Sequence, residues 1–264
     1  MFGKIFQLSA FTASVATADV TNHWAVIVSG STGFGNYRHQ ADTCHAYQLL
    51  KNRGIPEEQI ILLSYDDAAE SRDNPFPGKL FNKPTATGTP GKDVYEGCKF
   101  AYRRHEVTPK KLLQVLTGDA ENAKGPVLKS DENSEIFFYF ADHGAPGLVA
   151  MPCGNLAPNC LWGGYLYADQ LLDAFKTMKE KKMYKQMTVY MEACESGSMF
   201  TKLDKDLGIY AVSAANRSES SWATYCYPDD MIDGKHITAC LGDLFSVNWL
   251  EDSDRSNMAM ETLH

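Results

Sequence analysis

The chain has 264 residues, of which 44% are hydrophobic and 11% aromatic, so it is long enough to bury one large core. Its formal net charge of −8 argues against nucleic acid or an anionic membrane as a partner, since neither is attracted to an acidic surface. Seven cysteines, an odd number, suit a secretory protein with some disulfides and one free thiol.

The N-terminus has the pattern of a secretion signal. Lys4 precedes a mostly apolar run over 5–15 and then Ala16-Thr17-Ala18, which has the small-x-small form of a signal-peptidase site. We therefore expect a signal peptide over 1–18 and a single domain over 19–264. A slightly apolar tail is the alternative. No other segment is long and apolar enough to span a bilayer.

Apolar and amphipathic segments alternate along the rest of the chain. The first half predicts a strand over 24–29, a helix over 38–52, a strand over 60–65, and a helix that Thr108 caps and Pro109 begins. The segment 66–106, rich in Pro, Gly, Asn and Lys, is expected to form surface loops, some near the substrate cleft.

The second half continues the alternation. It predicts a strand over 135–141, a helix over 168–181, strands over 187–193 and 209–214, and a last apolar segment over 241–250. Strands that alternate with helices predict a mainly parallel sheet with helices on both faces and an active site at the carboxyl ends of the strands.

Two predicted strands end in residues that can carry out chemistry. His143 and Gly144 follow the strand over 135–141, and Cys194 follows the strand over 187–193. His143 can take the proton of the Cys194 thiol and form an ion pair with the thiolate, while the N–H groups of Gly144 and Cys194 can stabilise an oxyanion. The pattern predicts a cysteine hydrolase; a structural Cys and a structural His are the alternative.

The remaining cysteines suggest disulfides. Cys194 is the expected free thiol. Two pairs flank short loops and predict local bridges, Cys226 with Cys240 and Cys153 with Cys160, whereas Cys44 and Cys98 stay unassigned. A zinc site of Cys153, Cys160 and His143 is the competing interpretation, but the gap between the cysteines lacks a CxxC knuckle, so we expect no metal and no cofactor.

Several blocks, in order along the chain, resemble the legumain family of caspase-like cysteine peptidases, the asparaginyl endopeptidases. The blocks are His23-Trp24-Ala25-Val26-Ile27-Val28, Asn36-Tyr37-Arg38-His39-Gln40-Ala41-Asp42, Gly54-Ile55-Pro56-Glu57-Glu58-Gln59-Ile60, Tyr65-Asp66-Asp67, Asp142-His143-Gly144, Glu192-Ala193-Cys194-Glu195-Ser196-Gly197-Ser198 and Leu241-Gly242-Asp243. The resemblance implies a three-layer α/β/α caspase-like fold with a mainly parallel central sheet.

The same resemblance implies the catalytic roles. Cys194 would be the nucleophile and His143 the base, and Asn36 would orient the imidazole. An Asn carbonyl can accept the proton of one ring nitrogen and so leave the other nitrogen to face the thiol. A turn residue beside Gly33 and Gly35 is the alternative for Asn36.

A specificity pocket for asparagine is also implied by the resemblance, lined by Arg38, His39, Glu192, Ser220, Ser221 and Asp243. An asparagine side chain has one acceptor and one NH₂ donor, so a guanidinium on one side and carboxylates on the other satisfy both. Ionised aspartate would face Glu192 and Asp243, so cleavage after Asp is expected only in acid, where its carboxyl is protonated. Solvated charges or surface ion pairs are the alternative for each charge taken singly.

These features together predict a cysteine endopeptidase that cleaves after Asn, and after Asp at acidic pH, through a thioester acyl-enzyme. Expected partners are proteins and peptides with Asn at the cleavage site, and inhibitors such as cystatins, in a lysosome or vacuole or outside the cell. A peptide ligase and an inactive secreted binding protein are the alternatives. Family members usually continue into a C-terminal prodomain, which we expect to be absent here.

Overall fold

The structure, a computed structural model, describes residues 21–154 and 163–255. The signal peptide predicted over 1–18 therefore lies outside the described residues. In the described part of the chain, no helix combines the length and the apolar character that crossing a bilayer requires.

A six-stranded parallel sheet forms the centre of the molecule. Its strands run in the order β3-β2-β1-β4-β8-β9, and each neighbouring pair is parallel. Their bounds are β1 His23–Ser29, β2 Ile60–Ser64, β3 Tyr102–Arg103, β4 Glu135–Ala141, β8 Gln186–Glu192 and β9 Ile209–Ser213. The five longer strands lie where the sequence predicted strands, which confirms the mainly parallel sheet.

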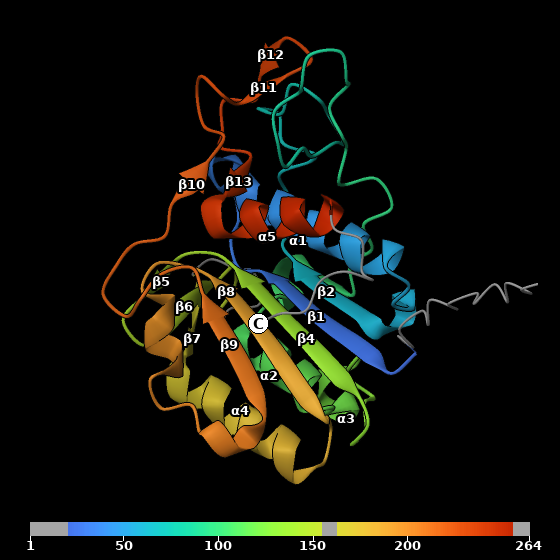
Figure 1. Cartoon of the computed structure of the whole chain (residues 1–264), viewed down its shortest axis with the longest axis vertical. Helices are drawn as coiled ribbons and strands as arrows, with labels where there is room; N and C mark the ends of the chain where they lie inside the picture. The colour runs from blue at the N-terminus through green and yellow to red at the C-terminus, as the bar shows by residue number, and fades with distance from the viewer. Residues whose placement is uncertain (1–20, 155–162, 256–264) are drawn as a thin grey trace, which may run out of the picture.

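Helices cover both faces of this sheet (Figure 1). One face carries α1 Tyr37–Asn52 and α5 Leu244–Arg255, and the other carries α2 Pro109–Leu116, α3 Ala120–Ala123 and α4 Ala168–Glu180. Because successive strand residues point to opposite faces, Ile27 packs in the core beneath α1 and α5, whereas Val26 packs with the apolar side of α2 and α4. The result is the predicted three-layer, caspase-like α/β/α fold.

Thr108 caps α2 as predicted, because its hydroxyl accepts a hydrogen bond from the Lys111 N–H at 3.1 Å. Pro109 is the first residue of the helix. The helix therefore has the start that the sequence predicted.

Three small antiparallel sheets were not predicted. They consist of β5 Gly144–Ala145, β6 Leu148–Met151 and β7 Gly164–Tyr167; β10 Ala223–Thr224 with β13 Gly242–Asp243; and β11 Met231–Ile232 with β12 Lys235–His236. Strands of two to four residues are too short to produce a readable alternation of apolar and polar residues. The last apolar segment, predicted over 241–250, is divided between β13 and α5.

The strand order places a switch point between β1 and β4. From β1 the chain passes through α1 to β2 on one side, whereas β4 is followed by β8 and β9 on the other side. In open parallel sheets, ligands bind outside the carboxyl ends of the strands at such a point. The ends of β1, β4 and β8 are therefore where a functional site is expected.

The segment 66–106 differs from the prediction of surface loops. Leu80, Phe81 and Val94 are buried, with exposures of 0%, 3% and 2%. The segment also supplies β3 at the edge of the sheet and packs along α1 (Figure 1). Its few apolar residues are spaced irregularly, so they carry no helix or strand period, but they still form part of the core beside α1.

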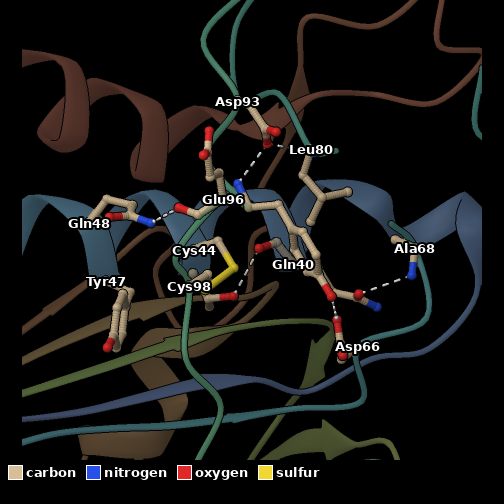
Figure 2. Close-up of a disulfide and its surroundings, with 12 residues drawn as sticks. Gln40, Cys44, Tyr47, Gln48, Asp66, Ala68, Leu80, Asp93, Glu96 and Cys98 are labelled. Atoms are coloured by element: carbon tan, nitrogen blue, oxygen red, sulfur yellow. Dashed lines mark hydrogen bonds between the residues drawn. A yellow bond between two sulfur atoms is a disulfide. The ribbon is translucent and has the colours of Figure 1, made fainter. Parts of the chain in front are cut away.

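A disulfide joins this segment to α1. Cys44 and Cys98, which the sequence left unassigned, are bonded (Figure 2). Beside the bridge, two side chains of α1 bond to the segment: Gln40 accepts from the Ala68 N–H at 3.1 Å, and Gln48 Nε2 donates to the Glu96 carbonyl at 2.5 Å. The segment is therefore fixed to the helix at several points.

The other cysteines follow the predictions where they are described. Cys226 and Cys240 form the predicted disulfide. Cys153 is also disulfide-bonded, so its sulfur is not available as a zinc ligand, while Cys160 lies outside the described residues. Cys194 is the free cysteine of the described residues, as predicted.

Replacing both Cys44 and Cys98 by Ala should lower the free energy of unfolding by about 2 to 4 kcal/mol, because the bridge closes a long loop in the unfolded chain. Its sequence separation is 54 residues, against 14 for Cys226 and Cys240. Urea unfolding would measure the loss, with the Cys226→Ala, Cys240→Ala variant as the control for a shorter loop. A double variant as stable as the wild type would contradict the prediction.

Candidate active site

Cys194 is presented by a sharp turn after β8. Glu195 has a φ of 49°, in the left-handed region, and its N–H donates to the Glu219 carbonyl at 2.8 Å. A turn of 3-10 helix over Ser196–Phe200 follows immediately. The abrupt change of direction leaves Cys194 half-buried at the carboxyl edge of the sheet.

Gly144 brings the end of β4 against Cys194. A Cβ atom at this position would lie 2.3 Å from the Cys194 carbonyl oxygen, a distance that no side chain tolerates. The neighbouring Asp142 N–H donates to the Glu192 carbonyl at 3.0 Å and so extends the β4–β8 pairing to this point. The backbones that carry the predicted base and nucleophile are therefore in direct contact.

Asn36 and His143 are hydrogen-bonded as the resemblance implied. The Asn36 Nδ2 donates to the Thr32 carbonyl at 2.9 Å, which turns Oδ1 of the same amide toward His143, 2.8 Å from Nε2. Since Oδ1 can only accept, Nε2 carries the ring proton and Nδ1 keeps its lone pair. Asn36 stands at the N-cap position of α1 yet makes no side-chain cap bond, so its amide is used for the histidine.

The thiol itself faces Ser221. The Cys194 Sγ lies 3.7 Å from the Ser221 hydroxyl and 3.8 Å from its carbonyl oxygen. Among the described residues no hydrogen bond joins Cys194 to His143, a contact that in many enzymes tightens only when substrate binds. Ser220 is exposed beside Ser221.

The surroundings of His143 affect its protonation. Partial burial, and then the Arg38 cation, lower the pKa of His143. Both effects disfavour the imidazolium and favour the neutral ring. A neutral His143 is suited to accept the thiol proton as a general base.

Four of the six predicted pocket residues, Arg38, His39, Glu192 and Asp243, converge at one place. Arg38, near the start of α1, donates from Nε to Asp243 Oδ1 at 2.8 Å. The buried His39 has Nδ1 2.7 Å from the Ser31 hydroxyl and Nε2 3.4 Å from Asp243 Oδ2. Burial, and then the Arg38 cation, lower the pKa of His39 well below its ordinary value and so favour the neutral ring.

Glu192 completes the predicted set from the end of β8. Its Oε2 accepts hydrogen bonds from the backbone N–H and the hydroxyl of Ser246, at 2.8 and 2.9 Å. Its Oε1 is buried and has no hydrogen-bond partner among the described residues. Burial, and then the charge of Asp243, raise the pKa of Glu192 to about 8.

Asp42 is a member of this cluster that the sequence analysis did not single out. It is fully buried, its Oδ2 accepts the Asp243 N–H at 3.2 Å, and burial followed by the charge of Asp243 raises its pKa well above the ordinary value. A signal was available, because Asp42 lies four positions after Arg38 and so one turn along the same face of α1.

A metal ion has a geometric candidate site here. Ligand atoms of His39, Asp142 and His143 all lie within 4.8 Å of one another. However, His39 contacts Ser31 and Asp243, and the Nε2 of His143 is bonded to Asn36. Both imidazoles thus have hydrogen-bond partners among the described residues, while the Nδ1 of His143 keeps its lone pair.

Replacing Asn36 by Ala should slow alkylation of the Cys194 thiol by iodoacetamide by about tenfold or more, because the tautomer that leaves Nδ1 free is no longer enforced. His143→Ala should slow it at least as much. Mass spectrometry of the modified peptide measures the rate, and Ser218→Ala, a change in a nearby exposed loop, is the control. Equal rates in all variants would show that the pair does not act on the thiol.

The stability that Glu192 contributes should fall as the pH rises from about 4.5 to about 8. The pKa of Glu192 is raised from 4.5 to about 8 on folding. The stability that its bound proton contributes is thus complete below about 4.5 and is lost as the pH rises through about 8. Urea unfolding of the wild type and of Glu192→Gln, which cannot titrate, measures this. A Glu192→Gln variant with an unchanged pH dependence would contradict the assignment.

Comparison with known proteins agrees with the geometry. The chain is 47% identical to legumain of Bos taurus over 250 residues, 93% of this chain and 53% of that protein. It is 46% identical to legumain of Homo sapiens, with the same two shares covered, and 46% identical to the vacuolar-processing enzyme delta-isozyme of Arabidopsis thaliana, where the shares are 91% and 49%. The chain thus spans about half the length of the curated relatives it matches. The model of the Peptidase C13 family matches residues 23–264, and the chain belongs to that family.

Proposed function

We propose that this site hydrolyses peptide bonds on the carboxyl side of asparagine, and of aspartate in acid, through a thioester on Cys194. The observation that carries the proposal is the Asn36–His143 hydrogen bond of 2.8 Å, which leaves one imidazole lone pair free beside a strand-end thiol. Membership of the Peptidase C13 family, and the relatives named legumain, support a cysteine endopeptidase.

The first half of the reaction forms the acyl-enzyme. His143 Nδ1 accepts the thiol proton as Cys194 Sγ attacks the scissile carbonyl carbon, and the N–H groups of Gly144 and Cys194 donate to the oxyanion. The tetrahedral intermediate collapses, the C–N bond breaks, and the leaving amine takes the proton from His143. The product that remains bound is a thioester.

Hydrolysis of the thioester completes the cycle. His143 takes a proton from water as the hydroxide attacks the thioester carbonyl, and the C–S bond breaks. The released acid leaves, and the proton on His143 returns to the Cys194 sulfur. The tautomer that Asn36 enforces serves both halves, because the same nitrogen accepts and returns the proton.

Specificity follows from the pocket charges. The guanidinium N–H groups of Arg38 that do not bond to Asp243 can donate to the carbonyl oxygen of an asparagine side chain. The unpartnered Glu192 Oε1 can accept from its NH₂ group when the carboxyl is ionised, and can donate to its carbonyl oxygen when the carboxyl is protonated. An ionised aspartate would place a carboxylate against these acids, whereas a protonated aspartate has a donor, so cleavage after Asp requires low pH.

The proposed setting is the secretory pathway, in a lysosome or vacuole or outside the cell. The disulfides Cys44–Cys98 and Cys226–Cys240 are of the kind that persists in oxidising compartments. Proteins and peptides with an accessible Asn are the proposed substrates, and cystatin-like proteins the proposed inhibitors.

The test is cleavage of matched peptides with Asn, Asp or Gln before the scissile bond, across acidic to neutral pH. We expect turnover after Asn throughout, after Asp only toward low pH, and none after Gln. Cys194→Ser, which keeps the size of the side chain, should reduce turnover by about a thousandfold or more, because hydroxyl oxygen is a far weaker nucleophile here than thiolate sulfur.

The other outcomes are equally informative. Joined peptides in place of hydrolysed ones would favour the ligase, since an amine would then intercept the thioester. No turnover, together with a Cys194 inert to alkylation, would refute the proposal and favour a binding protein. Equal cleavage after Asp at neutral pH would refute the pocket assignment alone.

A further inference from the structure

Asn82, in the segment between β2 and β3, connects the pocket acids to a distant part of the molecule. Its side chain is buried, and Nδ2 donates to Asp42 Oδ1 at 2.6 Å and to the Leu241 carbonyl at 3.0 Å. On the other side, its Oδ1 lies 2.7 Å from His45 Nδ1. One amide thus spans the space between α1 and the residues that lead into β13.

The orientation of this amide is determined by its neighbours. Two acceptors, a carboxylate and a carbonyl, face one end, so the NH₂ group must lie there. His45 must then donate from Nδ1 to the Asn82 oxygen. The second ring nitrogen of His45 lies 3.1 Å from Asp254 Oδ2, which is also an acceptor. Both nitrogens of the buried His45 therefore face acceptors, an arrangement that the doubly protonated ring satisfies.

Asp254 anchors the outer end of the chain of contacts. It lies near the end of α5, its side chain is 26% exposed, and Lys92 approaches it at 3.4 Å. The hydrogen bond from His45, and then its charge and that of Lys92, lower the pKa of Asp254 to about 2. The Asp254 carboxylate thus holds the outer nitrogen of the His45 ring, whose other nitrogen contacts Asn82.

The inner end reaches the specificity pocket. Asp42 receives the Asn82 hydrogen bond on Oδ1 and the Asp243 N–H on Oδ2, and Asp243 in turn holds Arg38. Little space is available for rearrangement, because a Cβ at Gly242 would lie 2.9 Å from the Asn82 Nδ2 and 2.4 Å from Val247. The placement of Asp42 and Asp243 is therefore coupled to the orientation of one amide.

We propose that Asn82 is a positioning residue for the asparagine pocket, and that His45 with Asp254 holds its amide in the orientation that the pocket requires. The inference rests on the proposed function and adds the origin of its pocket geometry. A reversed amide would direct an oxygen at the Asp42 carboxylate and at the Leu241 carbonyl. Asp42 would then lose a donor, and the backbone of Asp243 and the guanidinium of Arg38 would shift with it.

A donor–acceptor exchange tests the inner contact. Asn82→Asp places a carboxylate against Asp42, and we expect KM for the Asn peptide to rise about tenfold or more while kcat changes less than about threefold. The double variant Asn82→Asp, Asp42→Asn exchanges donor and acceptor and should recover most of the loss. Two results would overturn the inference. One is a KM that Asn82→Asp leaves unchanged, and the other is a double variant whose KM has risen by the product of the two single-variant increases.

A charge change on α5 tests the outer contact with less risk to folding. Asp254→Asn should raise KM severalfold, because the His45 ring loses the carboxylate that holds its outer nitrogen, whereas Asp252→Asn, at an exposed carboxylate of the same helix, should not. Alkylation of Cys194 should proceed at the wild-type rate in both, since a small reagent does not use the pocket. Equal effects of the two substitutions on KM, or a slower alkylation in Asp254→Asn, would count against a positioning role.

Peptide binding separates this inference from the proposed function. Calorimetry of the uncleaved Asn peptide on the Cys194→Ser background requires the pocket but not the thiol. If the wild type does not cleave and Asn82→Asp still weakens binding, with recovery by the exchange, the proposed function fails and the positioning role stands. If the wild type cleaves and Asn82→Asp changes neither KM nor this binding, the positioning role alone fails.

Discussion

Burial of several carboxyl groups beside a single guanidinium is the constraint on which the rest of this structure depends. Asp42, Asp142, Glu192 and Asp243 are all at most 3% exposed; Arg38 bonds to Asp243, and its charge favours the ionised forms of Asp142 and Glu192. An ionised carboxylate without a partner is costly to bury, so each must be protonated or receive hydrogen bonds. The pKa values of these acids are raised mainly because burial disfavours the ionised carboxylate.

The fold meets this constraint by bringing donors from distant parts of the chain. Ser246 at the start of α5 donates twice to Glu192, and Asn82 donates to Asp42 from the segment after β2. These donors must not move, because a small displacement leaves a charge unsatisfied. The packing of α1 and α5 on one face of the sheet, and the Cys44–Cys98 disulfide, hold the elements that carry them (Figures 1 and 2).

In the proposed function, the same arrangement separates substrate recognition from the chemical step. The pocket acids are buried, whereas His143 and Cys194 lie at the edge of the sheet where a peptide can reach them. Arg38 belongs to both regions, since it holds Asp243 and also lowers the pKa of His143 through its charge. The charge of Arg38 thus favours the neutral form of His143, and the same side chain bonds to Asp243.

The sequence by itself determined the order of strands and helices, the two strand ends with Cys194 and His143, and one of the disulfides. These features depend on short-range patterns, since apolar alternation and capping residues act within a few positions. The blocks that resemble the legumain family also named the pocket residues, and Arg38, His39, Glu192 and Asp243 do meet in space.

Only the tertiary structure decided the rest. It paired Cys44 with Cys98, buried a segment that reads as loop, and placed Asn82, His45 and Asp254 in one line of hydrogen bonds. These contacts join residues 37 to 209 positions apart, and the line from Asn82 reaches the pocket through Asp42. The physical reason is that an isolated Asn or Asp has no period and no preferred partner along the chain, so its hydrogen bonds exist only when folding brings donor and acceptor together.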